Sequence, residues 1–252
     1  MVRYEGTCSD RTGTVTGLVS DEPENEYTKL MVLYGLGLIF DMDGVLIDST
    51  STHTEAWLAY LQSHGIEIPA IEDRMLGKRN DAIVRDFFRG VPLTDEEVLG
   101  HGERKEQLYR EMMAPKLDSH MVPGVIEFLE RHRDRPIGLG TNGEPANVDL
   151  VLSGTNIQQY FRAVVSGHEV RLPKPHPDIY LKVADLLGVS PRNCVVFEDS
   201  LTGIEAARAA GMRVAGLTTT LPALPGVDLA VPNFLDAGLE PWLQSIALSA
   251  AM

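Results

Sequence analysis

The sequence predicts an α/β protein with a Rossmann-like, mostly parallel sheet core and an inserted helical cap domain. Two observations predict this class. Beyond residue 122, short apolar runs of strand length alternate with segments of helical spacing, and such an alternation gives right-handed crossovers and a parallel sheet covered on both faces. Residues 50–121, by contrast, show helical spacing with no comparable strand run.

The first strand is expected at residues 36–40, an apolar run that ends in acidic residues and a glycine. The segment that follows has three apolar helix faces, formed by Trp57, Leu58 and Leu61, by Ile83, Val84, Phe87 and Phe88, and by Val98, Leu108 and Met112. These faces indicate a helical insertion directly after the first strand.

Strands and helices alternate after Pro123 and Gly124. The expected strands are residues 137–140, 163–165, 194–197 and 213–217, and the expected helices are 125–132, 145–152, 177–187 and 201–210. Gly211 fits a left-handed helix end, and residues 241–252 are expected to form a terminal helix that docks on the sheet. We therefore assign residues 1–33 to an N-terminal extension, 34–49 and 122–252 to the α/β core domain, and 50–121 to the cap.

The composition excludes several classes of protein. Lys and Arg number 22 against 36 Asp and Glu, a net charge of −14, whereas binding to nucleic acid depends on basic residues that neutralise phosphates. No apolar run reaches the roughly 18 residues that a membrane span requires. The only cysteines are Cys8 and Cys194, which argues against a disulfide framework. We expect a cytoplasmic monomer that binds neither nucleic acid nor membrane.

Four carboxylates are expected at the carboxyl ends of two strands, where open α/β sheets bind ligands. Asp41 and Asp43 follow the first strand, and Glu198 and Asp199 follow the strand at 194–197. Their mutual repulsion in one pocket is tolerable only with a cation, and Mg²⁺ prefers a few carboxylates, a carbonyl and water. A single Asp at such a place could instead cap a helix, but four together favour a metal site.

Two further segments could bind an anion beside these acids. Thr141 and Asn142 precede an expected helix, so their side chains and the helix dipole could hold a phosphate, although an ordinary turn would look the same. Lys174 lies between prolines and could neutralise an anion and keep a nucleophile ionised. The alternative for Lys174 is an exposed side chain in a linker.

Four motifs in this order resemble those of the haloacid-dehalogenase-like (HAD) phosphohydrolases. They are Phe40-Asp41-Met42-Asp43-Gly44-Val45-Leu46-Ile47-Asp48-Ser49, then Thr141-Asn142, then Lys174-Pro175-His176-Pro177-Asp178, and Val196-Phe197-Glu198-Asp199-Ser200 with Gly203. The similarity covers residues 36–220, and the first and fourth motifs are specific. The subgroup that the chain most resembles contains β-phosphoglucomutase and sugar-phosphate phosphatases, which carry a helical cap where this sequence has its insertion.

The resemblance implies a phospho-aspartyl mechanism. Asp41 would attack phosphorus, while Asp43 would protonate the leaving oxygen and later activate water, for which it must retain a proton beside a second carboxylate. The implied Mg²⁺ ligands are Asp41, the Asp43 main-chain carbonyl, Asp199, and Glu198 directly or through water. Thr141, Asn142 and Lys174 would bind the phosphoryl oxygens. Haloacid dehalogenation is disfavoured, because the dehalogenases lack the second Asp.

The cap is expected to select the substrate. His53 and Trp57 share a helix face and stand where β-phosphoglucomutases carry a His and a Trp, although a solvated face for His53 and packing for Trp57 are alternatives. Gly77, Lys78 and Arg79 belong to a segment that resembles the family's specificity loop, and a solvated basic turn is the alternative for the two cations.

This loop departs from the mutase pattern. The family's mutases use a Lys just before the Gly and an Arg three residues after it, where this chain has Leu76 and Asn80. Lys78 and Arg79 could supply the charge from shifted positions, but loss of bisphosphate binding is the simpler interpretation. We expect a magnesium-dependent phosphatase of a small phosphorylated metabolite, a sugar or polyol phosphate. The alternatives are a β-phosphoglucomutase-type mutase and, in another class, a catalytically silent phospho-acceptor or binding module.

Overall fold

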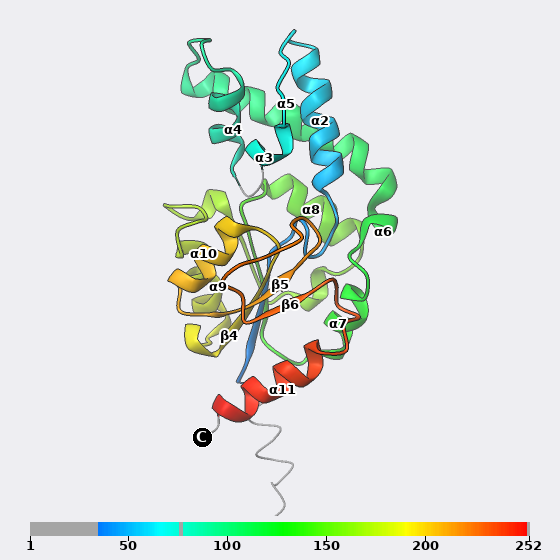
Figure 1. Cartoon of the computed structure of the whole chain (residues 1–252), viewed down its shortest axis with the longest axis vertical. Coiled ribbons are helices and arrows are strands. Elements are labelled where there is room, and N and C mark those ends of the chain that lie inside the picture. The colour runs from blue at the N-terminus through cyan, green and yellow to red at the C-terminus, as the bar shows by residue number, and fades with distance from the viewer. Residues whose placement is uncertain (1–34, 76–77, 251–252) are drawn as a thin grey trace, which may run out of the picture.

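The computed structural model describes residues 35–75 and 78–250, which form a sheet core with a group of helices at one end (Figure 1). The described strands are β1 (Gly37–Phe40), β2 (Ile137–Thr141), β3 (Ala163–Ser166), β4 (Cys194–Glu198), β5 (Arg213–Leu217) and β6 (Leu229–Val231). They form one sheet in the order β3-β2-β1-β4-β5-β6, and every pair is parallel. The predicted α/β class is confirmed.

Strand β1 lies in the middle of the sheet, between β2 and β4. All four of its residues are buried, as expected for a strand covered on both faces. Phe40 is in register with Leu139 of β2 and Phe197 of β4, so the three strands end at the same edge. The chain turns from one half of the sheet to the other here, which creates a crevice for ligands.

The two sheet faces are packed by different helices, because side chains alternate along each strand. Phe40 points into one apolar cluster and stacks on Phe197 with ring centroids 4.6 Å apart, whereas Ile39 points into another with Val183. The core helices are α7 (Val125–Arg131), α8 (Pro145–Gly154), α9 (Asp178–Leu187), α10 (Leu201–Ala209) and α11 (Leu239–Ala250).

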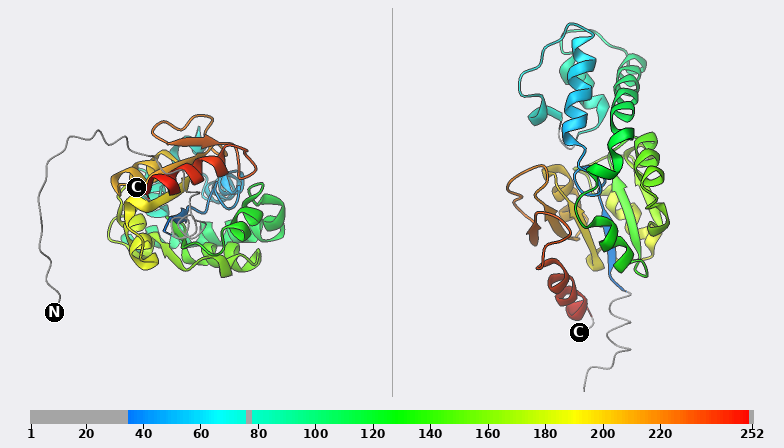
Figure 2. Two further views of the ribbon diagram at one scale, coloured as in Figure 1. Left: turned by 90° about the horizontal axis from the view of Figure 1, so that it is seen from below. Right: turned by 90° about the vertical axis from the view of Figure 1, so that its right-hand side faces the viewer.

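The inserted helices lie beyond the carboxyl edge of the sheet, at the end opposite α11 (Figure 2). They are α2 (Thr50–Gln62), α3 (Ile71–Met75), α4 (Asn80–Phe87), α5 (Asp95–Met113) and α6 (Leu117–His120). Their own apolar cluster includes Trp57, Val84 and Phe87. Leu58, which the sequence placed on this buried face, is 48% exposed; Tyr60 is buried instead, because α2 turns its 57, 60 and 61 positions inward.

Two adjacent connections join the cap to the core. Ile47 and Met121 form an antiparallel bridge, the Asp48 amide donates to the His120 carbonyl at 2.7 Å, and the Val122 amide donates to the Leu46 carbonyl at 3.0 Å. The path into the cap and the path out of it therefore lie side by side next to Asp43.

The boundaries of the core elements follow the sequence prediction closely, and Gly211 has the predicted left-handed conformation, with φ +74°. Strand β6 was not predicted. The N-terminal extension, Cys8 and Gly77 lie outside the described residues. No helix in the described part of the chain is long and apolar enough to span a membrane.

Candidate active site

A cavity of about 410 Å³ lies between the sheet edge and the cap. Its core side includes Asp41, Asp43, Thr141, Asn142, Lys174, Glu198 and Asp199, and its cap side includes His53, Trp57, Lys78, Asn80, Lys105 and Glu106. The structure therefore brings together all of the predicted core residues, which come from the ends of β1, β2 and β4 and from the loop before α9.

Lys174 joins two of the carboxylates. Its Nζ donates to Asp41 Oδ1 and to Glu198 Oε1, each at 2.7 Å. Burial disfavours the ammonium, but Asp41 and Glu198 outweigh that effect and raise the pKa of Lys174. The Lys174 amide also donates to Asn142 Oδ1 at 3.2 Å, which fixes the Lys174 loop against the end of β2. Lys174 is thus a buried, paired cation and not an exposed linker residue.

Glu198 is fully enclosed by hydrogen-bond donors. Oε1 accepts from Lys174 and from the Tyr180 hydroxyl at 2.8 Å, and Oε2 accepts from the amides of Asp199 and Ser200 and from Ser200 Oγ, each at 2.9 Å. Gly203 permits this position of the Glu198 carboxylate, since a Cβ at residue 203 would lie 1.6 Å from Glu198 Oε1. A carboxylate has about four lone-pair sites, so Glu198 is suited to hold Lys174 and the Asp199 backbone in place.

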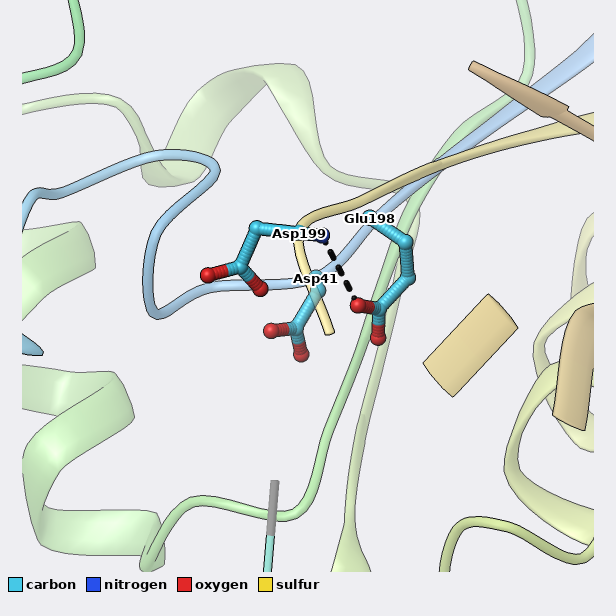
Figure 3. Close-up of side chains that lie close together, drawn as sticks. All are labelled: Asp41, Glu198 and Asp199. Atoms are coloured by element: carbon cyan, nitrogen blue, oxygen red, sulfur yellow. Dashed lines mark hydrogen bonds between the residues drawn. The ribbon is translucent and has the colours of Figure 1, made fainter. Parts of the chain in front are cut away.

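Asp41, Glu198 and Asp199 point toward one another (Figure 3), and each offers an oxygen within 4.8 Å of the others. Burial raises the pKa of Asp41 to about 7, against the attraction of Lys174. Burial and the charges of Glu198 and Asp41 hold the pKa of Asp199 well above its ordinary value. One ammonium therefore faces an excess of buried carboxylates, and this set of hard oxygen donors fits Mg²⁺.

Gly44 shapes the Asp199 side of this cluster. Its φ is +74°, and a Cβ at this position would lie 1.9 Å from Asp199 Oδ2. The Thr220 hydroxyl donates to the same carboxylate oxygen. The glycine of the first motif thus allows the β1 turn to approach the carboxylate closely, for which any side chain is too large.

Asp43 lies at the boundary between core and cap. Ser49 Oγ donates to Asp43 Oδ1 at 2.6 Å, and His53 Nε2 lies 3.4 Å from the same oxygen. Burial raises the pKa of Asp43, but the contacts with His53 and Ser49 outweigh burial, and the pKa is lower than usual. The expectation that a neighbouring carboxylate keeps a proton on Asp43 is therefore wrong for this state of the protein, because cap and turn donors stabilise its anion.

A buried polar chain in the cap leads to Asp43. Lys105 Nζ lies 2.8 Å from His53 Nδ1 and donates to Glu106 Oε1 at 2.7 Å. An ammonium is a donor only, so His53 Nδ1 accepts and its Nε2–H faces Asp43. The His53 ring stacks on Tyr109 with centroids 3.7 Å apart. Lys105, Asp43 and Tyr109 thus surround the His53 ring, and His53 does not lie on a solvated helix face.

Lys105 and Glu106 were not identified from the sequence. Both are almost completely buried, and Lys105 Nζ also lies 5.0 Å from the centre of the Trp57 ring. Trp57 therefore combines packing in the cap with a place on the cavity wall. The available sequence signal was the four-residue spacing of Lys105 and Tyr109, which puts both on one helix face.

The remaining predicted residues take different positions. Thr141 Oγ1 accepts from the Gly143 amide at 3.0 Å, at the turn before α8. Lys78 is exposed and lines the cavity. Arg79 is absent from the cavity lining: its guanidinium donates to the Gly167 carbonyl of the core at 3.3 Å and lies 3.5 Å from Asp81. Arg79 thus connects the specificity segment to the core.

The fold and the site define a capped α/β protein with an acidic centre at the carboxyl ends of its middle strands. The family described as haloacid dehalogenase-like hydrolase matches residues 37–211, and the chain belongs to this family. The resemblance found in the sequence is therefore confirmed, and with it an activity of the phosphatase or phosphosugar-mutase type.

Relatives of both activities are similar to this chain. Fructose-1-phosphate phosphatase YqaB of Escherichia coli K12 is 34% identical over 178 residues, which cover 70% of this chain and 93% of that protein. Beta-phosphoglucomutase of Bacillus subtilis is 31% identical over 212 residues, which cover 81% and 92%. The crystal structure of β-phosphoglucomutase from Clostridium difficile matches with a TM-score of 0.73 and 26% identity, over 85% of this chain and 97% of that one.

Proposed function

We propose that this chain is a magnesium-dependent phosphatase that hydrolyses a small sugar or polyol phosphate through a phosphorylated Asp41. The observation that carries the proposal is the position of Asp41 at the cavity wall, with Lys174 Nζ 2.7 Å from Oδ1. The Lys174 ammonium favours the ionised form of this buried carboxylate, which is the form that acts as a nucleophile.

Asp41 and Asp199 would hold Mg²⁺, and Glu198 would orient Lys174 and the Asp199 backbone. The ion, when bound, would neutralise negative charge on the phosphoryl oxygens. Thr141, Asn142 and Lys174 would bind the same oxygens, and such preorganised charge accounts for much of the catalysis in phosphoryl transfer.

In the first step an Asp41 oxygen forms a bond to phosphorus as the ester bond breaks, and the leaving alkoxide takes a proton from Asp43. Asp43 must first gain that proton, and the negative charge of the entering phosphoryl group raises its pKa in the complex. In the second step Asp43 takes a proton from water, which attacks phosphorus and releases phosphate and Asp41. The lowered pKa of free Asp43 suits this second role.

A phosphosugar mutase is the second candidate, favoured by the similarity to the Bacillus subtilis mutase and by Lys78 on the cavity wall. The phosphatase is preferred because Arg79 is already bonded to the core and Asn80 donates to Glu106 at 2.8 Å. A silent phospho-acceptor is not favoured, since it needs neither the Asp41 and Asp43 pair nor a cap that excludes water.

The test is phosphate release from a panel of sugar and polyol phosphates with Mg²⁺, beside conversion of β-glucose 1-phosphate to glucose 6-phosphate with the 1,6-bisphosphate present. We expect phosphate release that EDTA abolishes and that Asp41→Asn removes, whereas Asp185→Asn, at an exposed position of α9, leaves it intact. Isomerisation without net phosphate release would establish the mutase instead.

A further inference from the structure

The cavity wall contributed by α8 and the cap carries carboxylates and amides. Glu144, the residue before the first turn of α8, lines the cavity with Asn147 of the same helix, and Asn80 and Glu106 line it from the cap. If the phosphoryl group is bound at Asp41 and Lys174, the rest of the substrate lies in the remaining cavity volume and meets these side chains.

The two carboxylates of this wall differ in what they can bind. Glu106 is buried; its Oε1 accepts from Lys105 and Asn80, and its Oε2 accepts from Asn147 at 2.6 Å. Lys105 balances its charge. The Glu144 side chain is 27% exposed, accepts from Asn80 at 3.3 Å, and lies 2.8 Å from His168 Nε2. Since a carboxylate offers about four lone-pair sites, Glu144 can still accept hydrogen bonds from a ligand.

The cationic compensation of Glu144 is weak, because the buried Lys105 ammonium attracts it only from beyond ion-pair distance and is bonded to Glu106. Among the residues that the structure describes, its ion-pair partner is His168, and no Lys or Arg pairs with it. Arg79 is turned toward the Gly167 carbonyl and Asp81. Lys78 lines the cavity from an exposed position, where water and salt screen its charge.

We propose that Glu144 is a specificity-determining residue, which admits phosphomonoesters with hydroxyl groups at the other end and rejects those with a second phosphate or a carboxylate there. The inference rests on the proposed phosphatase function. A hydroxyl would donate a charge-assisted hydrogen bond to Glu144, whereas a second anion would meet a like charge inside a partly enclosed cavity, where repulsion is stronger than in water.

The experiment compares kcat/KM for substrates that differ only in the second phosphate. Fructose 1-phosphate is paired with fructose 1,6-bisphosphate, and glucitol 6-phosphate with glucitol 1,6-bisphosphate. We expect the wild-type enzyme to prefer the monophosphate by at least about tenfold. Glu144→Gln should shrink this preference at least about threefold, mainly through a lower KM for the bisphosphate, because the amide keeps the size of the side chain and removes its charge.

Asp149→Asn is the matched control, because Asp149 is an exposed residue of α8 outside the cavity lining. It removes the same unit of charge and should keep the wild-type preference. An equal preference in Glu144→Gln and the wild type, or equal use of both esters by the wild type, would overturn the role of Glu144 while the phosphatase stands. Bisphosphate hydrolysis that Lys78→Ala abolishes would also overturn it. Absence of phosphate release from every ester by folded wild-type protein would overturn the proposed function itself.

Discussion

Replacement of Lys105 by methionine tests whether the buried polar chain of the cap depends on one ammonium. Lys105 Nζ is 2.7 Å from Glu106 Oε1, and both side chains are buried. Burial opposes ionisation of Glu106, but Lys105 outweighs it, and the pKa of Glu106 falls from 4.5 to about 2. At about 1.4 kcal/mol per pH unit, this shift corresponds to about 3 kcal/mol. Burial lowers the pKa of Lys105 despite the attraction of Glu106, so we expect the lower end of the about 3–5 kcal/mol that removal of one partner from a buried ion pair costs in general.

The sign of the pH dependence follows from the direction of the shift. Because the folded-state pKa of Glu106 lies below its unfolded value, the stabilisation is complete above pH 4.5 and is lost as the pH falls toward 2. Lys105→Met should therefore lower the free energy of unfolding at pH 7 by about 3 kcal/mol. It should also flatten the loss of stability in acid. Lys105→Met combined with Glu106→Gln should recover part of the loss, since no buried charge is then unpaired.

Urea unfolding followed by tryptophan fluorescence measures this effect in the cap. The chain has two tryptophans, so Trp242→Phe leaves Trp57, whose ring lies 5.0 Å from Lys105 Nζ, as the reporter. Lys116→Met is the control, because Lys116 makes a half-exposed ion pair with Glu55 at 3.5 Å that contributes at most about 1 kcal/mol. A loss below about 1 kcal/mol in Lys105→Met, with the acid profile unchanged, would refute the reasoning.

Three further predictions concern the core site. Asp43→Asn should lower kcat by about 10²–10⁴, because the acid and base steps are lost. An unchanged kcat in steady-state assays would exclude Asp43 as the general acid and as the general base. Burial raises the pKa of Asp41 from 3.8 to about 7, so the stability contributed by its neutral form is complete below pH 3.8 and is lost as the pH rises to about 7. Without metal, this contribution to thermal stability should therefore fall between about pH 4 and pH 7, and Mg²⁺ should raise the stability more at pH 8 than at pH 6. Equal stabilisation by Mg²⁺ at both pH values would contradict this. Gly44→Ala should weaken Mg²⁺ binding in calorimetry, because the added Cβ would lie 1.9 Å from Asp199 Oδ2. Gly188→Ala is the control for backbone strain alone, since Gly188 also has a positive φ but a Cβ there would have nothing within 4 Å. Similar Mg²⁺ affinities in the two variants would argue against the close approach of Gly44 to Asp199.

The core site could be predicted from the sequence because its residues follow buried strands directly. A parallel sheet brings the ends of β1, β2 and β4 to one edge whatever the details of the packing, so Asp41, Thr141 and Glu198 had to converge. Strand β6 is three residues long and only half-buried, and a run of that length carries no clear alternation.

The cap residues could not be predicted in the same way. Lys105 and Glu106 lie in a helix of low overall hydrophobicity, where charged residues are ordinarily solvated. Their burial depends on how α5 crosses α2 and meets α8, which local spacing does not encode. The low pKa of Asp43 has the same origin, since His53 reaches Asp43 from the cap. Sequence reasoning thus found the residues whose position is fixed by chain connectivity, and in the cap it found His53, Trp57 and Lys78 but missed Lys105 and Glu106, whose burial depends on tertiary packing.

Helix α5 connects the cap both to α8 and to the side chains around Asp43. Glu106 accepts from Asn147 Nδ2 at 2.6 Å, and Arg110 donates to Asn147 Oδ1 at 2.9 Å. Glu106 and Arg110, four residues apart on α5, therefore both hydrogen-bond to the buried side-chain amide of Asn147 on α8. Lys105, next to Glu106, holds His53 beside Asp43. Glu106 and Arg110 therefore fix the cap to the core, and Lys105 of the same helix orients His53 beside Asp43. A cap lifted from α8 would carry Lys105 and His53 away with it, so the low pKa of Asp43 depends on these cap contacts.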